Sequence, residues 1–214
     1  MNTYLFDLDG TLIDSVPDLA SSINFMLKSL DKNTFSVEII RNWVGNGAST
    51  LVKRALSNGT MQNIDEEEFN KAFEIFMNHY ENNLCKQTYL YPNVRELLEE
   101  IKGNNLAIIT NKPYKFVEPI LEELGIRKYF KLIYGADSLP EKKPSPLPLI
   151  SAMKHFNTNK AIMIGDSKND ILAAKNANIP SIAVTYGYNY SEDISIYNPD
   201  FIIDDILKVK ECVK

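Results

Sequence analysis

The stretch YLFDLDGTL at residues 4–12 is an apolar run that ends abruptly in acidic residues and a glycine. Two further apolar runs end in a similar way. Residues 106–109 (LAII) lead into a threonine and an asparagine, and residues 161–164 (AIMI) lead into a glycine and an aspartate. Continuous apolar runs of this length are typical of strands buried on both faces of a parallel sheet.

Two more strand candidates follow at residues 181–184 and 201–203. Helical patterns, each ended by a glycine or asparagine, separate the runs. They lie at residues 92–102, 116–124 and 170–177. Strands that alternate with helices predict an α/β fold with a Rossmann-like parallel sheet.

The stretch at residues 16–84 has no convincing strand pattern. Its apolar residues instead form three stripes at helical spacing. These are Leu19, Ile23, Leu27 and Leu30; Leu51, Val52, Ala55 and Leu56; and Phe69, Phe73, Phe76 and Tyr80. We interpret the stripes as core packing. The sequence thus predicts a helical cap domain at residues 16–84, inserted into an α/β core of residues 1–15 and 85–214.

The composition is that of an ordinary globular chain. Of 214 residues, 44% are hydrophobic and 24% charged, and the formal net charge is −5. The absence of a Lys/Arg stripe argues against a nucleic-acid partner, and no segment suggests binding to a membrane. Two cysteines, Cys85 and Cys212, are too few for a disulfide framework or a zinc site. We therefore expect a reduced, cytoplasmic protein.

Polar residues follow the three main runs. In an open α/β sheet, ligands bind beyond the carboxyl ends of the strands, so these residues are expected to converge. They are Asp7, Asp9, Thr110, Asn111, Asp166 and Asp170. Carboxylates gathered in this way repel one another and require a cation. Oxygen ligands beside a phosphate substrate favour Mg²⁺.

The segment at residues 6–12 carries the candidate chemistry. Asp7 could attack phosphorus, and Asp9, two residues further along an extended chain, could protonate the leaving group. Gly10 permits a sharp turn, and Thr11 offers a hydroxyl to a phosphoryl oxygen. On these residues alone, a strand that runs into an acidic turn is an equally good interpretation.

Lys143 favours the catalytic interpretation. It lies in KKPSP at residues 142–146, where two prolines stiffen the backbone. A lysine facing carboxylates and a phosphate would neutralise charge on both. Taken singly, each element has a plainer interpretation. The lysine pair could be solvated, and the polar residues after the strands could simply cap helices.

Together these segments resemble the four motifs of the haloacid dehalogenase-like hydrolase superfamily. More closely, the chain looks like the bacterial phosphoglycolate phosphatases. The resembling stretches are residues 6–24, 43–56 (WVGNGASTLVKRAL), 110–149, 165–174 (GDSKNDILAA) and 185–190 (TYGYNY). Asn93 and Asn178 stand where members of the family often have glycine, and asparagine also suits turns.

The resemblance implies a role for each candidate residue. Asp7 would be the nucleophile and Asp9 the acid/base, with Thr110 binding phosphate and Lys143 serving as the lysine of the third motif. Asp7, Asp166 and the carbonyl of Asp9 would bind Mg²⁺, and Asp170 would support them from behind.

The helical insert resembles the family's cap, which closes over the site. Gly45, Asn46 and Gly47 precede a helix expected to begin near Ala48. Bare amides at a helix start favour anions, so this loop, and Gly47 in particular, could meet a substrate carboxylate. Lys53 or Arg54 could contribute, although a surface role suits both, and the glycines could also form a plain turn. The expected substrate is 2-phosphoglycolate.

Several alternatives share part of the pattern. A phosphomutase, or a phosphatase for a sugar phosphate or nucleotide, would share every core residue. A dehalogenase would not need an acid at Asp9. A phospho-accepting signalling module would not explain Asp9 or the helical insert, and a non-catalytic binding protein would be expected to have lost one of the key residues. The oligomeric state does not follow from the sequence.

Overall fold

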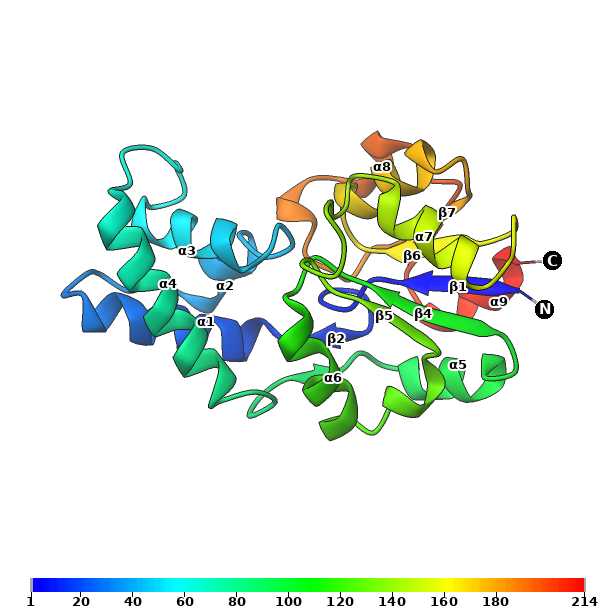
Figure 1. The fold of residues 1–214 in the computed structure, drawn as a ribbon, viewed down its shortest axis with the longest axis horizontal. Helices are drawn as coiled ribbons and strands as arrows, with labels where there is room; N and C mark the ends of the chain where they lie inside the picture. The colour runs from blue at the N-terminus through cyan, green and yellow to red at the C-terminus, as the bar shows by residue number, and fades with distance from the viewer. Residues whose placement is uncertain (1, 214) are drawn as a thin grey trace.

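The computed structural model describes residues 2–213 and shows a parallel sheet between helices, with a helical group at one end (Figure 1). The sheet has six strands in the order β5-β4-β1-β6-β7-β8, and every neighbouring pair is parallel. The strands are β1 (Thr3–Phe6), β4 (Asn105–Ile109), β5 (Leu132–Tyr134), β6 (Ile162–Gly165), β7 (Ser181–Val184) and β8 (Phe201–Ile203). This architecture confirms the predicted α/β fold class.

All five apolar runs recognised in the sequence are strands. The edge strand β5 was missed, although its three apolar residues form a run as long as that of β8. A separate two-residue pair was also missed. In it, β2 (Ile13–Asp14) runs antiparallel to β3 (Tyr89–Leu90). Such short segments carry too little periodicity to be recognised without their partners.

The register of the central strands determines where the polar residues meet. Phe6 at the end of β1 pairs with Ile108 of β4 on one side and Ile164 of β6 on the other. The carboxyl ends of all three strands are therefore level. The residues that follow them, including Asp7 and Asp166, emerge along one edge of the sheet.

Alternation along β1 sends its side chains to two separate cores. Leu5 packs with residues of α7 (Leu147–His155) and α8 (Lys168–Asn176). Phe6 faces the other side, which is covered by α5 (Val94–Ile101), α6 (Tyr114–Glu123) and the short α9 (Val209–Cys212). Figure 1 shows α7 and α8 on one face of the sheet and α5 and α6 on the other.

Short connections complete the core. Four single-turn 3₁₀ helices span Arg127–Tyr129, Asn189–Ser191, Ile194–Tyr197 and Ile206–Lys208. Asn93, which precedes α5, and Asn178, which follows α8, have φ values of 64° and 54°. Both asparagines thus adopt the left-handed conformation that glycine would otherwise supply.

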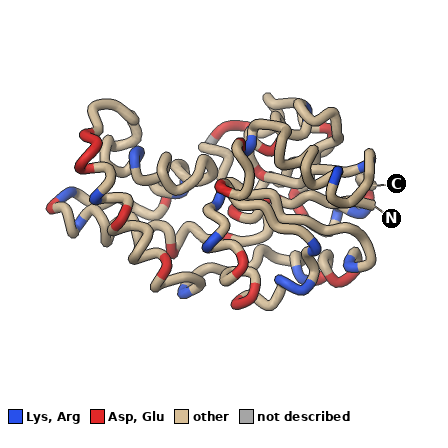
Figure 2. Tube along the Cα trace, viewed as in Figure 1, with Lys and Arg blue, Asp and Glu red and all other residues tan. Residues whose placement is uncertain are grey.

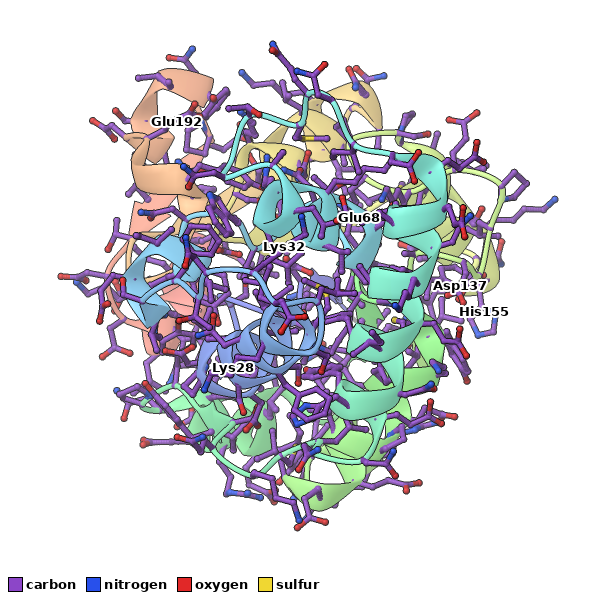
Figure 3. The ribbon with its side chains drawn as sticks, turned by 90° about the vertical axis from the view of Figure 1, so that its left-hand side faces the viewer. Lys28, Lys32, Glu68, Asp137, His155 and Glu192 are labelled. Carbon is purple, nitrogen blue, oxygen red and sulfur yellow. The ribbon has the colours of Figure 1, made fainter. Side chains whose placement is uncertain are left out.

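Four helices lie together beyond the carboxyl edge of the sheet (Figure 1). They are α1 (Val16–Ser29), α2 (Val37–Arg41), α3 (Ala48–Leu56) and α4 (Glu66–Glu81). Each apolar stripe recognised in the sequence packs inward, with Ile23, Val52 and Phe76 fully buried. On the outer face, Lys32 and Glu68 form an ion pair at 2.7 Å that ties the end of α1 to α4 (Figure 3).

The chain crosses between the helical group and the sheet twice, and hydrogen bonds hold the two crossing segments together. The buried carboxylate of Asp18 in α1 accepts hydrogen bonds from the backbone N–H groups of Gln87 and Thr88 and from the Thr88 hydroxyl, at 2.6–3.1 Å. The β2–β3 pair lies beside this point. A buried carboxylate with several donors holds both crossing segments at one place.

Charged residues of both signs are interspersed along the chain (Figure 2). Within residues 2–213, none of the helices has the length and apolar character needed to cross a membrane.

Candidate active site

Three aspartates meet at the carboxyl edge of the sheet. One carboxylate oxygen from each of Asp7, Asp166 and Asp170 lies within 4.8 Å of the other two, and all three residues are buried. Asp7 follows β1, Asp166 follows β6, and Asp170 lies in the first turn of α8. The sheet register and the start of one helix thus bring together residues that are 159 positions apart (166 − 7).

Close approach of the backbone to this cluster requires glycine. A Cβ atom on Gly10, whose φ is +86°, would lie 2.2 Å from Asp166 Oδ2. One on Gly187 would lie 2.1 Å from Asp166 Cβ. Gly10 and Gly187, from distant segments, therefore both lie against Asp166. A side chain at either position would displace Asp166.

Lys143 lies within the carboxylate cluster. Its ammonium group is 3.0 Å from Asp7 Oδ1 and 2.5 Å from Asp170 Oδ1, and its side chain is 1% exposed. The other oxygen of Asp170 accepts hydrogen bonds from the N–H and the hydroxyl of Ser167. Asp170 consequently both caps α8 and anchors Lys143.

The cluster holds more negative charge than one lysine neutralises. Burial, reinforced by Asp170, raises the pKa of Asp7 to about 7 despite the opposing effect of Lys143. Burial and the charges of Asp7 and Asp170 raise the pKa of Asp166 well above its usual range. The two partner aspartates raise the pKa of Lys143 even though burial opposes this. The site therefore favours an added positive charge.

The donor set fits a hard divalent cation. Every candidate ligand atom is a carboxylate oxygen, and Asp7 Oδ1 accepts no hydrogen bond from the described residues beyond its ion pair with Lys143. Asp166 is held in place by the Thr11 hydroxyl at 3.1 Å and the Tyr188 N–H at 2.8 Å. Oriented oxygen ligands of this kind suit Mg²⁺.

Asp9 lies apart from the cluster and has its own partners. Its Oδ1 accepts a hydrogen bond from the Ser15 hydroxyl at 2.5 Å. The ammonium of Lys112 lies 3.1 and 3.2 Å from its two oxygens. The sequence did not single out Ser15 or Lys112. Lys112 could have been identified from its position in the sequence, because it directly follows Thr110 and Asn111 at the end of β4.

The remaining core candidates lie close by. Asn111 donates to the backbone oxygens of Lys143 at 3.0 Å and Gly45 at 3.4 Å. The Thr110 hydroxyl accepts the N–H of Lys112 at 3.2 Å. The Thr11 hydroxyl, predicted to face a phosphoryl oxygen, donates to Asp166 Oδ1 at 3.1 Å.

A cavity lies between the helical group and the sheet edge. The sheet side contributes Asp7, Asp9, Thr110, Asn111 and Lys112. The helical side contributes mostly apolar walls together with the loop before α3. Its lining residues are Leu19, Val44, Gly45, Gly47, Ala48, Leu51, Phe76 and Tyr80. The expected nucleophile and acid/base thus open onto one cavity.

Hydrogen bonds hold the loop at residues 45–47 against the core. The Gly45 carbonyl accepts from Asn111 and from Asn169, and the Asn46 carbonyl accepts from Lys142 at 3.0 Å. A Cβ on Gly45 would lie 2.6 Å from the Tyr190 hydroxyl. The glycines therefore permit contact with the core as well as forming a turn. The sequence did not identify Asn169 or Tyr190 as its partners.

Helix α3 begins at Ala48 as expected, and no side chain caps its first turn. Gly47 occupies the N-cap position with φ of +91°. Three nearby cations are used locally, and one of them is Lys142, which donates to the Asn46 carbonyl. Arg54 donates to the Trp43 carbonyl at 2.7 Å, and Lys53 lies over the Phe69 ring. The free amides of α3 thus remain available to an anion.

The fold and site agree with the sequence comparison. The chain matches the haloacid dehalogenase-like hydrolase family over residues 4–184. It therefore belongs to that family, which confirms the resemblance inferred from the motifs.

Individual relatives indicate the class of enzyme within this family. A phosphoglycolate phosphatase of Colwellia psychrerythraea is 52% identical over 206 residues, covering 94% of this chain and 91% of the relative. One of Vibrio parahaemolyticus is 47% identical, covering 97% and 94%. A crystal structure described as a predicted phosphoglycolate phosphatase from Haemophilus somnus superposes with a TM-score of 0.94 at 41% identity, covering 100% and 98%. These relatives confirm the expected enzyme class, a phosphoric monoester hydrolase.

Lys142 and Lys143 provide a matched pair of variants. Lys143→Ala removes the buried cation beside Asp7, so kcat should fall by about 10²-fold or more. Lys142→Ala removes one exposed contact to the 45–47 loop and should change kcat by less than about threefold. Steady-state kinetics on both variants measures the difference. The reverse pattern would contradict the assignment of Lys143.

The raised pKa of Asp7 makes a prediction for stability in the metal-free chain. Its pKa rises from 3.8 to about 7 on folding, so its favourable contribution is complete below about pH 4 and is lost as the pH rises through about 7. Asp7→Asn should therefore raise the free energy of unfolding at pH 8, by on the order of 2 kcal/mol, and by much less at pH 4.

Denaturant unfolding at both pH values, in the presence of a chelator, measures this effect. Asp31→Asn, which changes an exposed carboxylate, provides the baseline. An equal effect of Asp7→Asn at pH 4 and pH 8 would show that Asp7 has an ordinary pKa.

Proposed function

We propose that this chain is a Mg²⁺-dependent phosphatase that hydrolyses 2-phosphoglycolate to glycolate and phosphate through an aspartyl-phosphate. One observation carries the proposal. Asp7 is paired with Lys143, lies beside Asp166 and Asp170, and opens onto the cavity between the helical group and the sheet edge. A carboxylate held in this way suits attack on phosphorus. The names of the relatives support the choice of substrate.

Asp7, Asp166 and the backbone carbonyl of Asp9 would hold the cation, with Asp170 supporting them through Lys143. When bound, Mg²⁺ supplies positive charge that offsets the phosphoryl and carboxylate charges. Lys143 adds a fixed positive charge beside Asp7. Thr110 and Asn111 line the same cavity and would help to bind the phosphoryl group.

The first step transfers the phosphoryl group to the enzyme. A carboxylate oxygen of Asp7 attacks phosphorus, and the bond from phosphorus to the glycolate oxygen breaks. Asp9 donates a proton to that departing oxygen, so glycolate leaves as an alcohol. Lys143 holds Asp7 at the start of this step through its ion pair.

The second step releases phosphate. Asp9, now a carboxylate, takes a proton from a water molecule that attacks phosphorus. The bond between phosphorus and the Asp7 oxygen breaks, which regenerates the Asp7 carboxylate and the protonated Asp9. The apolar walls contributed by the helical side would exclude other water during the reaction.

The helical group fits the role of a cap. Residues 16–84 would form the cap domain, and residues 1–15 and 85–214 would form the core. The hydrogen bonds between Asp18 and Thr88, where the chain crosses between the two parts, support this division. The loop at residues 45–47 and the uncapped amides of α3 would receive the carboxylate of 2-phosphoglycolate. This loop gives the cap a part in substrate choice as well as in closure.

The cysteines form no disulfide among the described residues, which is compatible with the cytoplasmic location that we propose. Cys85 and Cys212 are both free. Burial raises the pKa of the Cys85 thiol to about 11, so it remains protonated and unreactive near neutrality.

A panel of phosphate monoesters tests the substrate assignment. Because 2-phosphoglycolate alone in this panel carries a carboxylate, its kcat/KM should exceed those of sugar phosphates, nucleotides and 4-nitrophenyl phosphate. Gly47→Ala should raise KM for 2-phosphoglycolate by roughly fivefold, a loss within the range for an anion at a helix start. KM for 4-nitrophenyl phosphate should change less.

Gly59→Ala is the matched control. Gly59 also lies in the helical group with positive φ, but a Cβ there meets only Trp43 at 3.4 Å, and Gly59 does not line the cavity. Several sugar phosphates or nucleotides ranking above 2-phosphoglycolate would refute the substrate and leave the Asp7 chemistry standing.

A further inference from the structure

Lys112 is a buried cation in the cavity wall that the proposed mechanism does not use. It is the only basic side chain among the described residues that line the cavity. Lys143, which neutralises Asp7 and Asp170, lies behind that wall. The side chain of Lys112 is 3% exposed, so its charge depends on the few groups that surround it.

The ammonium of Lys112 has three close polar partners. It lies 3.1 Å and 3.2 Å from the two oxygens of Asp9, and 2.7 Å from the hydroxyl of Tyr80. An ammonium has three N–H donors, and these contacts account for all of them. The pKa of Lys112 is raised because Asp9 and Tyr80 together outweigh burial.

These contacts fix the carboxylate of Asp9 from two directions. Ser15, at the entrance to α1, donates to one oxygen at 2.5 Å, while Lys112 reaches both. A carboxylate held at both oxygens has little freedom to rotate. A proton donor misplaced by about 1 Å loses much of its effect, so this constraint bears directly on proton transfer.

Tyr80 connects this arrangement to the helical group. It lies near the end of α4 and is buried, with its ring stacked on Phe76 at 5.8 Å and edge-on to Phe116 of α6 at 5.0 Å. Burial raises the pKa of Tyr80 to about 12, which keeps its hydroxyl protonated near neutrality. Its contact with Lys112 therefore exists only while α4 lies against the core.

We propose that Lys112 is a positioning residue for Asp9, and that the Tyr80 hydroxyl makes this positioning depend on α4 lying over the site. The inference rests on the proposed function, since Asp9 must handle the proton for its position to matter. Two other roles would give different results. Lys112 could bind the carboxylate of the substrate, or its ion pair could serve the fold alone.

Substrates with different leaving groups distinguish these three roles of Lys112. Glycolate needs a proton from Asp9 as the bond to phosphorus breaks, whereas 4-nitrophenolate is stable enough to depart without one. Loss of Asp9 positioning should therefore slow the first step with 2-phosphoglycolate far more than with 4-nitrophenyl phosphate. Single-turnover release of each alcohol, with saturating enzyme in excess over substrate, isolates that step from hydrolysis of the phospho-enzyme.

Two variants and one control make the test. Lys112→Met should slow glycolate release by on the order of 10²-fold, and nitrophenolate release by less than about fivefold. Tyr80→Phe, which removes one hydroxyl, should give the same selectivity with a loss of about tenfold for glycolate. KM for 2-phosphoglycolate should stay within about threefold of the wild-type value in both variants, since positioning acts on the chemical step.

Lys115→Met is the matched control. Lys115 also joins the start of α6 to α4, through an exposed ion pair with Glu81 at 2.6 Å, but does not contact Asp9. Its removal should leave both release rates within about twofold of wild type. Denaturant unfolding of all three variants identifies any general loss of stability.

Three outcomes would overturn the inference. A raised KM for 2-phosphoglycolate with unchanged release rates would make Lys112 a substrate ligand. Equal losses with both leaving groups would make it structural. If Lys112→Met does not fold, an unchanged glycolate rate in Tyr80→Phe would still refute the role of α4. Failure of the proposed phosphatase chemistry is distinct, because the wild-type protein would then release neither alcohol. If only the choice of 2-phosphoglycolate fails, the wild type still releases 4-nitrophenolate, and the preferred alkyl phosphate takes the place of 2-phosphoglycolate in the same comparison.

Discussion

Mutual repulsion among the buried carboxylates of Asp7, Asp166 and Asp170 governs the design of this site. Their oxygens lie within 4.8 Å of one another, a separation at which two unit charges repel by roughly 3 kcal/mol at an effective dielectric constant near 20. Lys143 offsets part of this repulsion through Asp7 and Asp170, and the Tyr188 N–H and Thr11 hydroxyl support Asp166. The remaining excess of negative charge is what makes a divalent cation a natural partner.

The fold provides the rigidity that holds such a cluster together. Level registration of β1, β4 and β6 brings the residues after Phe6, Ile109 and Gly165 to one edge, and two apolar cores hold the sheet from both faces. The helical group then closes the space above this edge. It contacts the core through the 45–47 loop on one side and through Tyr80 on the other, so the cavity is bounded by both parts of the chain.

The sequence predicted the parts of this arrangement that depend on local pattern. Buried strands such as β1 and β7 are continuous apolar runs, and the helical stripes around Ile23 and Phe76 repeat at helical spacing. Residues in motifs, such as Asp7 and Lys143, were recognisable because several weak signals occurred in one order. Edge strand β5 was missed, although its three residues are as apolar as those of β8, which was recognised. Lys112 was missed because a lysine before proline resembles a solvated loop residue until Tyr80, 32 positions away, is placed beside it.

Capture of the covalent intermediate tests the central claim most directly. Asp9→Asn should still accept a phosphoryl group from 4-nitrophenyl phosphate in the presence of Mg²⁺, because that leaving group needs no proton. The variant should hydrolyse the intermediate slowly, since the base that activates water is gone. Mass spectrometry of the digested protein is predicted to find the phosphoryl group on Asp7, and none in a variant that also carries Asp7→Asn. A phosphoryl group on another residue, or normal turnover in Asp7→Asn alone, would contradict the account.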